Sequence, residues 1–209
     1  VPSVATYPTW GGADAIAIRG YSTELSVRGI ANSLEGVPLN SFTYATSLYD
    51  KPLINLQHLD RIEMIRGPGS TLYGSDAFHG VMSQHLKSSN PSELRLSGST
   101  AAPEHQNLAL FASQPFGNTY VNTGLAYDKQ GGQDLEYSYT SPSDGLSYQS
   151  ERDYEYEDIS AFVTLKSGDI KSGQFKLSTY FNDYSSSEFP GTGTQFFTRL
   201  PLVFDLDSS

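Results

Sequence analysis

The stretch that decides the fold runs from Asp60 to Gly80 and reads DRIEMIRGPGSTLYGSDAFHG. A short apolar run, Ile62 to Ile65, leads to Arg66 and then to the turn-forming Gly67-Pro68-Gly69. This order predicts a half-buried strand that ends in a tight turn, with one cation held at the turn. No recognisable catalytic nucleophile, metal cluster or phosphate loop accompanies the stretch, so it does not indicate an enzyme.

The same residues closely resemble the signature of the plug domain of TonB-dependent outer-membrane receptors, in which IE and a hydrophobic run precede RGP-x-S-x-LYG. Three earlier segments extend the resemblance. Val1-Pro2-Ser3-Val4 is similar to the family's PGV segment, Ile18-Arg19-Gly20 to its IRG motif, and Leu34 to Leu39 to its DGVPL, with Glu35 in place of the usual Asp. The motifs cover the chain up to about Lys87. The final plug strand, Val81 to Lys87, is more polar than the family's β-branched run.

Composition limits the other classes of protein. The chain of 209 residues is long enough for one or two domains, and it has no Cys, which excludes disulfides and thiolate metal sites. A net charge of −10 argues against nucleic-acid binding. The first residues do not form a signal peptide, so we expect a mature or truncated start.

Beyond Asn90-Pro91-Ser92 the sequence changes to longer segments in which apolar and polar residues alternate. One face carries Leu94, Leu96, Gly98, Leu108, Leu110, Ala112, Val121, Leu125, Tyr127, Ile159, Ala161, Val163, Leu165, Phe175, Leu177 and Phe181. The other carries Arg95, Ser97, Ser99, Asn107, Ala109, Phe111, Asn122, Gly124, Asp128, Asp158, Ser160, Thr164, Lys166, Lys176, Ser178 and Asn182. A period of two over about ten residues is typical of membrane barrel strands. The predicted connections alternate between short ones, at Gly117-Asn118 and Gly168 to Ser172, and long polar ones, at Gln130 to Ser150 and Ser187 to Ser209. Outer-membrane barrels have the same alternation, with short turns at the periplasmic end and long loops at the extracellular end.

Taken alone, this second half fits a soluble antiparallel sandwich as well as a membrane barrel. The plug signature favours the barrel. The predicted fold is therefore an α+β plug over residues 1–90, followed over residues 91–209 by the first antiparallel transmembrane β-barrel strands. Plugged transporters have about 22 strands, and five predicted strands are too few. We therefore expect the front portion of a longer receptor, with the TonB box upstream.

The resemblance implies two plug–barrel lock residues. Plug arginines of the IRG and RGP motifs pair with glutamates inside the barrel wall in this family, which implies that role for Arg19 and Arg66. Val27-Arg28-Gly29 is a second candidate for the IRG element, so Arg28 stays open beside Arg19. The glutamate partners are expected in strands that this chain does not contain.

The resemblance also implies an apical ligand-binding loop, Asn40 to Tyr49, because it follows the GVPL residues. Its Phe42, Tyr44 and Tyr49 offer flat apolar faces, to which the two tyrosines add a hydroxyl group, and this combination suits a bulky chelate. The alternative is that one or more of these aromatic side chains packs into the plug core.

The four histidines and one acidic stretch are further candidates for a site. His58, His79, His85 and His105 lack metal-ligand spacing, which favours surface or packing roles and no metal site. Within the acidic stretch Glu151 to Asp158, alternation places Tyr154 and Tyr156 in the lumen, either lining a ligand vestibule or forming a solvated strand top.

The function implied by the resemblance is energy-coupled import across the outer membrane of a Gram-negative bacterium. The partners would be TonB, outer-membrane lipid and a scarce ligand, most often a ferric siderophore in this family, with no cofactor. One alternative is a surface-binding protein for adhesion or sensing on the same fold, without transport. Another is a soluble β-rich binding domain.

Overall fold

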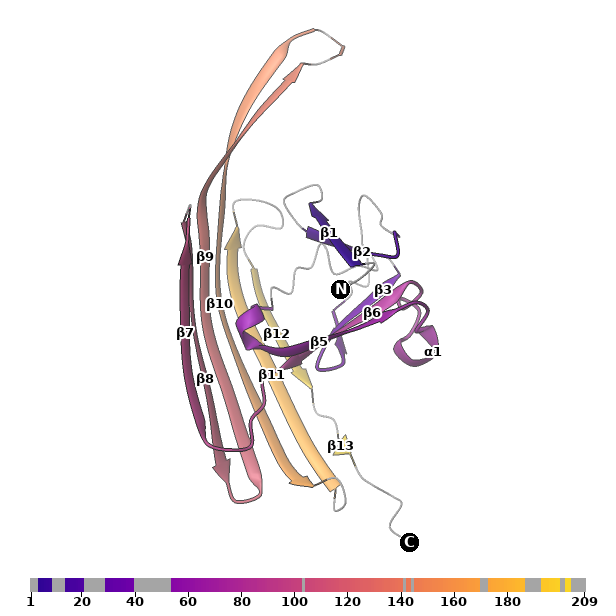
Figure 1. Ribbon diagram of the computed structural model, residues 1–209, viewed down its shortest axis with the longest axis vertical. Coiled ribbons are helices and arrows are strands. Elements are labelled where there is room, and N and C mark those ends of the chain that lie inside the picture. Colours follow the sequence, from indigo (N-terminus) through magenta and orange to yellow (C-terminus); the bar gives the residue numbers. More distant parts are fainter. Residues whose placement is uncertain are drawn as a thin grey trace.

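The computed structural model describes residues 4–8, 14–20, 29–39, 54–102, 104–140, 142–143, 145–169, 173–186, 193–199 and 202–203. Within these ranges, no helix is both long and apolar enough to cross a membrane. The described strands belong to three separate sheets, two in an N-terminal unit and one in a tall wall beside it (Figure 1).

The N-terminal unit is built on a four-stranded sheet in the order β4-β3-β6-β5. Its strands are β3 (Ile30–Leu34), β4 (Val37–Pro38), β5 (Leu59–Arg66) and β6 (Gly80–Leu86). Strands β3 and β6 pair in parallel, and the other neighbours are antiparallel. A separate antiparallel pair is formed by β1 (Val4–Pro8) and β2 (Asp14–Ile18). The helical turns are η1 (Leu56–His58) and α1 (Ser70–Tyr73), so the unit is α+β as predicted.

The predicted turn after Arg66 folds the chain back onto β6. Gly67 has a φ of 136° and its N–H donates to the carbonyl of His79 at 3.1 Å. A Cβ on Gly80 would lie 2.6 Å from Cδ1 of Ile18 and 2.9 Å from the carbonyl oxygen of Ile65. The glycines are therefore needed where the backbone approaches its neighbours closely.

The prediction that Ile62 to Ile65 is half-buried was wrong in degree. Ile62 is 44% exposed and Ile65 is 40% exposed. The physical reason is that β5 lies at the edge of its sheet, so fewer neighbours cover it.

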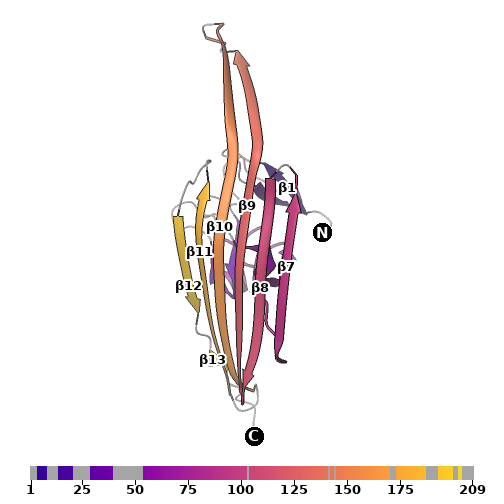
Figure 2. The same cartoon turned by 90° about the vertical axis from the view of Figure 1, so that its left-hand side faces the viewer.

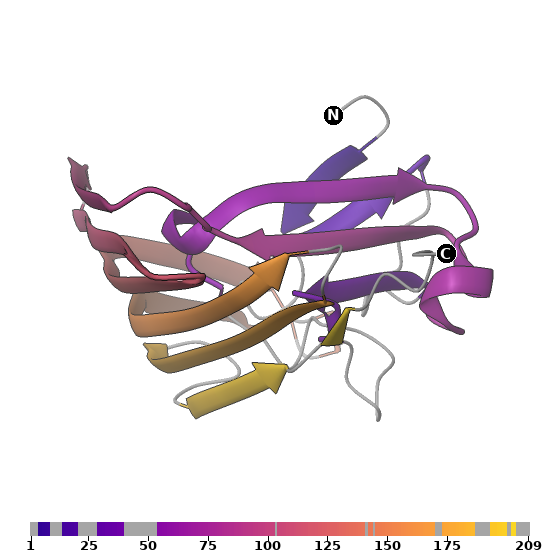
Figure 3. The same ribbon diagram turned by 90° about the horizontal axis from the view of Figure 1, so that it is seen from below.

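The wall is one antiparallel sheet in the order β12-β11-β10-β9-β8-β7, with β13 paired to β11. Its strands are β7 (Glu93–Ala101), β8 (Glu104–Phe116), β9 (Thr119–Thr140), β10 (Ser147–Asp169), β11 (Gly173–Ser186), β12 (Gly193–Arg199) and β13 (Leu202–Val203). The strands run side by side along the long axis of the molecule (Figure 2). Seen from below, the wall curves, and the N-terminal unit lies on its inner side (Figure 3).

Two predicted loops were wrong in extent. Most of the predicted loop from Gln130 to Ser150 is strand, because β9 continues to Thr140 and β10 begins at Ser147. The two strands pair to their tips, where Thr140 lies opposite Ser147, so their backbone groups are satisfied by each other. This hairpin rises well above the other strands (Figure 1). The predicted loop from Ser187 to Ser209 likewise contains β12 and β13.

The predicted alternation of faces is confirmed. Successive strand partners form an apolar row across the outer face: Leu96, Leu110, Leu125, Ala161 and Phe181. The opposite face lies toward the N-terminal unit. Its buried residues include the aromatic side chains of Phe111, Phe162 and Tyr180 and a larger polar set: Asn107, Asn122, Asp158, Ser160, Thr164, Ser178 and Asn182. Apolar residues outward and polar residues inward are the arrangement of a membrane barrel wall.

Residues 87–92 connect the N-terminal unit to the wall, since β6 ends at Leu86 and β7 begins at Glu93. The Ser89 N–H donates to Oδ1 of Asn122 at 2.8 Å, and its carbonyl accepts from Oγ of Ser113 at 2.7 Å. The predicted domain boundary at residue 90 falls within this connection, and it stays a prediction.

Candidate functional site: the seam between the N-terminal unit and the wall

The seam is the surface along which the N-terminal unit meets the inner face of the wall. Its first element is η1, which begins because Oδ1 of Asn55 accepts from the Gln57 N–H at 3.0 Å. Leu59 is buried while Leu56 is 71% exposed, so the two leucines do not share a face. Leu59 already has an extended backbone, with a ψ of 136°, so it does not continue the helical face.

His58 is the most deeply placed residue of η1, with 1% of its surface exposed. Its Nε2 lies 3.1 Å from Oγ of Ser160 on the wall. Its ring meets Phe162 and Tyr180 edge-on, at centroid distances of 5.1 and 5.9 Å. Burial lowers the pKa of His58 to about 4, and the nearby charge of Lys87 adds to that effect. The side chain therefore packs as a neutral ring, which is the second of the two roles expected for it, surface or packing.

A glycine of the wall makes room for this ring. A Cβ on Gly124 would lie 2.2 Å from Cε1 of Phe162 and 2.8 Å from Nδ1 of His58. Real Cβ atoms do not approach neighbours so closely. Gly124 therefore sets how near η1 can come to β9.

One apolar cluster spans the seam. Leu34, Leu39, Leu59 and Leu86 come from the N-terminal unit, and Phe111, Phe162 and Tyr180 come from the wall. The Asn55 N–H donates to the Tyr180 hydroxyl at 3.2 Å, so the tyrosine joins the cluster and also holds η1. Each large side chain buried in this way contributes about 1.5–3 kcal/mol, and separating the two parts would expose all of them.

Polar side chains form a layer on the inner face of the wall. Nδ2 of Asn182 donates to Oδ1 of Asp158 at 3.0 Å, and Nδ2 of Asn107 donates to Oδ2 of Asp128 at 2.7 Å. Tyr156 is half-buried on the same face as Asp158, as the alternation predicted. The side chain of Tyr154 lies outside the described part of the chain. Among the described residues, no group of three or more His, Asp or Glu side chains is arranged to hold a metal ion.

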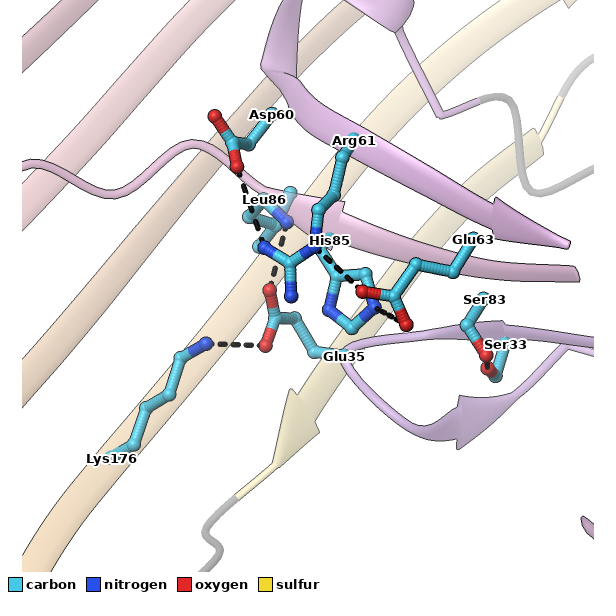
Figure 4. Close-up of polar contacts among 9 residues, drawn as sticks. All are labelled: Ser33, Glu35, Asp60, Arg61, Glu63, Ser83, His85, Leu86 and Lys176. Carbon is cyan, nitrogen blue, oxygen red and sulfur yellow. Dashed lines mark hydrogen bonds and ion pairs between the residues drawn. The ribbon is translucent and has the colours of Figure 1, made fainter. Parts of the chain in front are cut away.

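An ion pair also crosses the seam (Figure 4). Nζ of Lys176 on β11 contacts Oε2 of Glu35, which lies in the turn between β3 and β4. Oε1 of the same carboxylate accepts from the Leu86 N–H at 2.8 Å. In the sequence, Glu35 stands out only as a replacement for Asp in the DGVPL motif, and the alternation of β11 places Lys176 on the same face as Ser178 and Asn182. No local signal joined the two residues.

The predicted lock arginines lie near one another, away from the wall. Arg66 ends β5, at the end of the sheet that leads to α1, on the far side from the wall (Figure 1). A Cβ on Gly67 would lie 3.8 Å from a terminal nitrogen of Arg19, so the two arginines flank the same turn. Both side chains are exposed. Their lock role stays a prediction, and Arg28 lies outside the described residues.

The predicted ligand-binding residues Phe42, Tyr44 and Tyr49 also lie outside the described residues. The nearest described residues before and after that segment are Leu39 and Ile54. Leu39 belongs to the apolar cluster of the seam, and Ile54 packs against it.

Residues 1–81 match the family model of the TonB-dependent Receptor Plug Domain. The chain carries a TonB-dependent receptor plug. The N-terminal unit is therefore the plug, and the wall is part of an outer-membrane barrel.

Two curated relatives are similar in sequence. The vitamin B12 transporter BtuB of Vibrio vulnificus is 29% identical over 168 residues, which cover 78% of this chain and 26% of the transporter. An iron-regulated outer membrane virulence protein of Vibrio cholerae is 38% identical over 74 residues, 30% of this chain and 11% of that protein. The chain thus spans about a quarter, or less, of the length of these relatives. Together with the fold, these relatives assign the chain to the outer membrane.

Solved structures share the fold. The ferripyoverdine receptor of Pseudomonas aeruginosa superimposes with a TM-score of 0.63 at 15% identity, covering 88% of this chain and 22% of that receptor. The copper transporter OprC superimposes with a TM-score of 0.63 at 16% identity, covering 96% of this chain and 30% of that transporter. Both comparisons include the plug and the wall together.

Proposed function

We propose that the full-length receptor imports a scarce ligand across the outer membrane by TonB-dependent transport, and that the ligand is a ferric siderophore. The observation that carries the proposal is how the seam is built. Among the described strands, the plug sheets and the wall sheet are separate, so the two parts meet through side chains. A plug held in this way can move or rearrange without breaking a shared ladder of backbone hydrogen bonds.

The transport step is then a conformational change that has to be driven. Moving the plug exposes the apolar cluster around Phe162 and Tyr180, which costs free energy. Energy delivered through TonB would offset that cost. Because the proposed step moves the plug without covalent chemistry, the receptor acts as a transporter and not as an enzyme.

The siderophore assignment is supported by the relatives. One relative that matches in sequence is an iron-regulated outer membrane virulence protein. The solved structures with the same fold include receptors for ferripyoverdine, ferric yersiniabactin and ferric enterobactin. The aromatic residues of the loop, Phe42, Tyr44 and Tyr49, suit a flat, bulky chelate. Another sequence match, over 168 residues, is to a vitamin B12 transporter, so cobalamin is the principal competing ligand.

The test is uptake by the full-length receptor in a Gram-negative host that lacks its own receptors for the ligands. Radiolabelled iron on a panel of siderophores, cobalamin and copper would be offered with TonB present and with TonB deleted. Uptake of one ferric siderophore that vanishes without TonB would support the proposal. Uptake of cobalamin or copper instead would overturn the ligand assignment, and binding without any uptake would favour the surface-binding alternative.

A further inference from the structure

Glu35 occupies a backbone conformation that a glutamate rarely adopts. Its φ is 50°, and Gly36 follows with a φ of 74°. Together they form the two-residue turn between β3 and β4, where Gly, Asn or Asp is the usual choice at the first position. Placing a longer L-residue at positive φ costs about 1 kcal/mol or more, and such strain points to a role for the side chain.

The side chain supplies that role through two contacts. The Glu35 carboxylate is 10% exposed, and its two oxygens bind different parts of the molecule. Oε1 holds the Leu86 N–H at the end of β6, and Oε2 holds Nζ of Lys176 on the wall (Figure 4). One carboxylate thus ties the β3–β4 turn, the exit of the plug sheet and strand β11 together.

The contact lies where the seam is open. A small pocket is lined by Glu35, Leu86 and Tyr180, among others, so the plug and the wall do not close completely here. Lys176 is near the beginning of β11, at the opposite end of the wall from the long β9–β10 hairpin (Figure 1). The pair therefore joins the plug to the wall beside this pocket, near the end of the wall that carries the short turns.

The other ion pairs of this region are of a different kind. Arg61 contacts Glu63 at 2.7 Å and Asp60 at 3.4 Å, and all three side chains are more than half exposed and lie on one strand. Glu63 also lies 3.4 Å from Nε2 of His85 on β6, within the same sheet. Exposed pairs of this kind contribute little to stability. Removing one partner of a buried pair is more disruptive, because it leaves the other charge without compensation.

We propose that the Glu35–Lys176 pair is a latch that keeps the plug sealed against the wall in the resting receptor. The latch has the opposite polarity to the predicted arginine locks, with the carboxylate on the plug and the cation on the barrel. Both residues are positioning residues, since they act through the seam. The latch deepens the proposed transport function, because a sealed resting state is what an energy-driven opening would act on.

The test measures ion leakage through the purified full-length receptor in planar bilayers, without ligand or TonB. Glu35→Gln removes the charge but keeps a carbonyl oxygen for the Leu86 N–H. Lys176→Met removes the cation, and Lys176→Arg keeps it. We expect Glu35→Gln and Lys176→Met each to raise the resting conductance several-fold. The double variant should leak no more than either single variant, because both substitutions break the same pair. Lys176→Arg should keep the wild-type conductance.

The matched control is Glu63→Gln, which removes an exposed ion pair of the same plug that does not touch the wall. It should leave the conductance unchanged. Wild-type conductance in Glu35→Gln, or multiplied effects in the double variant, would overturn the latch. Because the conductance assay needs no transport, it tests the latch even if the uptake experiment fails. A wild-type receptor that is sealed but imports nothing would refute the proposed function and leave the latch standing.

Discussion

His58 of the plug and Ser160 of the wall are hydrogen-bonded across the seam, with 3.1 Å between Nε2 and Oγ. The two residues are 102 positions apart in the chain. The bond lies between the apolar cluster and the polar layer of the wall, next to Gly124. Its presence therefore indicates whether η1 is packed against the wall.

Acidification should loosen this contact. The pKa of His58 is about 4 when the ring is buried and 6.5 when it is free, so a displaced ring binds a proton that the seated ring does not. The seating free energy is fully present above pH 6.5 and falls as the pH drops toward 4, by about 2 kcal/mol at pH 5. Hydrogen exchange of the amides of η1 in the full-length receptor, corrected for intrinsic rates, would measure the loss. His58→Gln lacks the titrating ring, so equal losses in both proteins would contradict this account.

Gly124→Ala should push the plug off the wall. The added methyl group would overlap the rings of Phe162 and His58, and overpacking of this kind costs about 1–3 kcal/mol. Protease susceptibility of the plug in the full-length receptor would rise accordingly. Gly98→Ala is the matched control, since a Cβ there would be 3.4 Å from its nearest neighbour, the carbonyl oxygen of Asn107. Equal susceptibility of the two variants would show that Gly124 does not set the spacing.

Arg66→Ala should weaken plug seating if Arg66 is a lock residue. A carboxylate in the lumen of the complete barrel would lose its partner, which is strongly unfavourable for a buried charge. We expect several-fold higher sensitivity to large antibiotics or reduced ligand uptake. Arg66→Lys should rescue only in part, because lysine lacks the bidentate fork. Arg61→Ala is the control, since Arg61 pairs with neighbours on its own strand. Wild-type behaviour of Arg66→Ala in both assays would count against the lock.

Truncating Tyr44 and Tyr49 together to Ala should weaken ligand binding by about 1–3 kcal/mol if either is a hot spot. A plugged lumen presents only its apical loops and inward wall residues to an arriving ligand. Ala substitutions at Val163 and Leu177, on the outward face of the wall, should leave affinity unchanged. Titration of the purified receptor with the imported ligand measures both. Unchanged affinity in the double tyrosine variant would move recognition to the extracellular loops.

Much of the fold was predictable because its signals are local. The glycines and proline after Arg66 specify a turn whatever surrounds them, and the alternation from Leu94 to Asn182 specifies which side chains share a face. The motif from Asp60 to Gly80 predicted the plug, and the period of two predicted the wall. The length of the β9–β10 hairpin was missed because polar, tyrosine-rich strands resemble a loop in composition, and only their mutual pairing distinguishes them.

By itself, the sequence therefore determined the plug, its turns and the inner and outer faces of the wall. Only the tertiary structure decided which residues meet at the seam. Glu35 and Lys176 are 141 positions apart, and whether they touch depends on the register of β11 and on where the plug sits along it. The same holds for His58, Ser160 and Gly124, because a contact between separate sheets leaves no periodic pattern in either one.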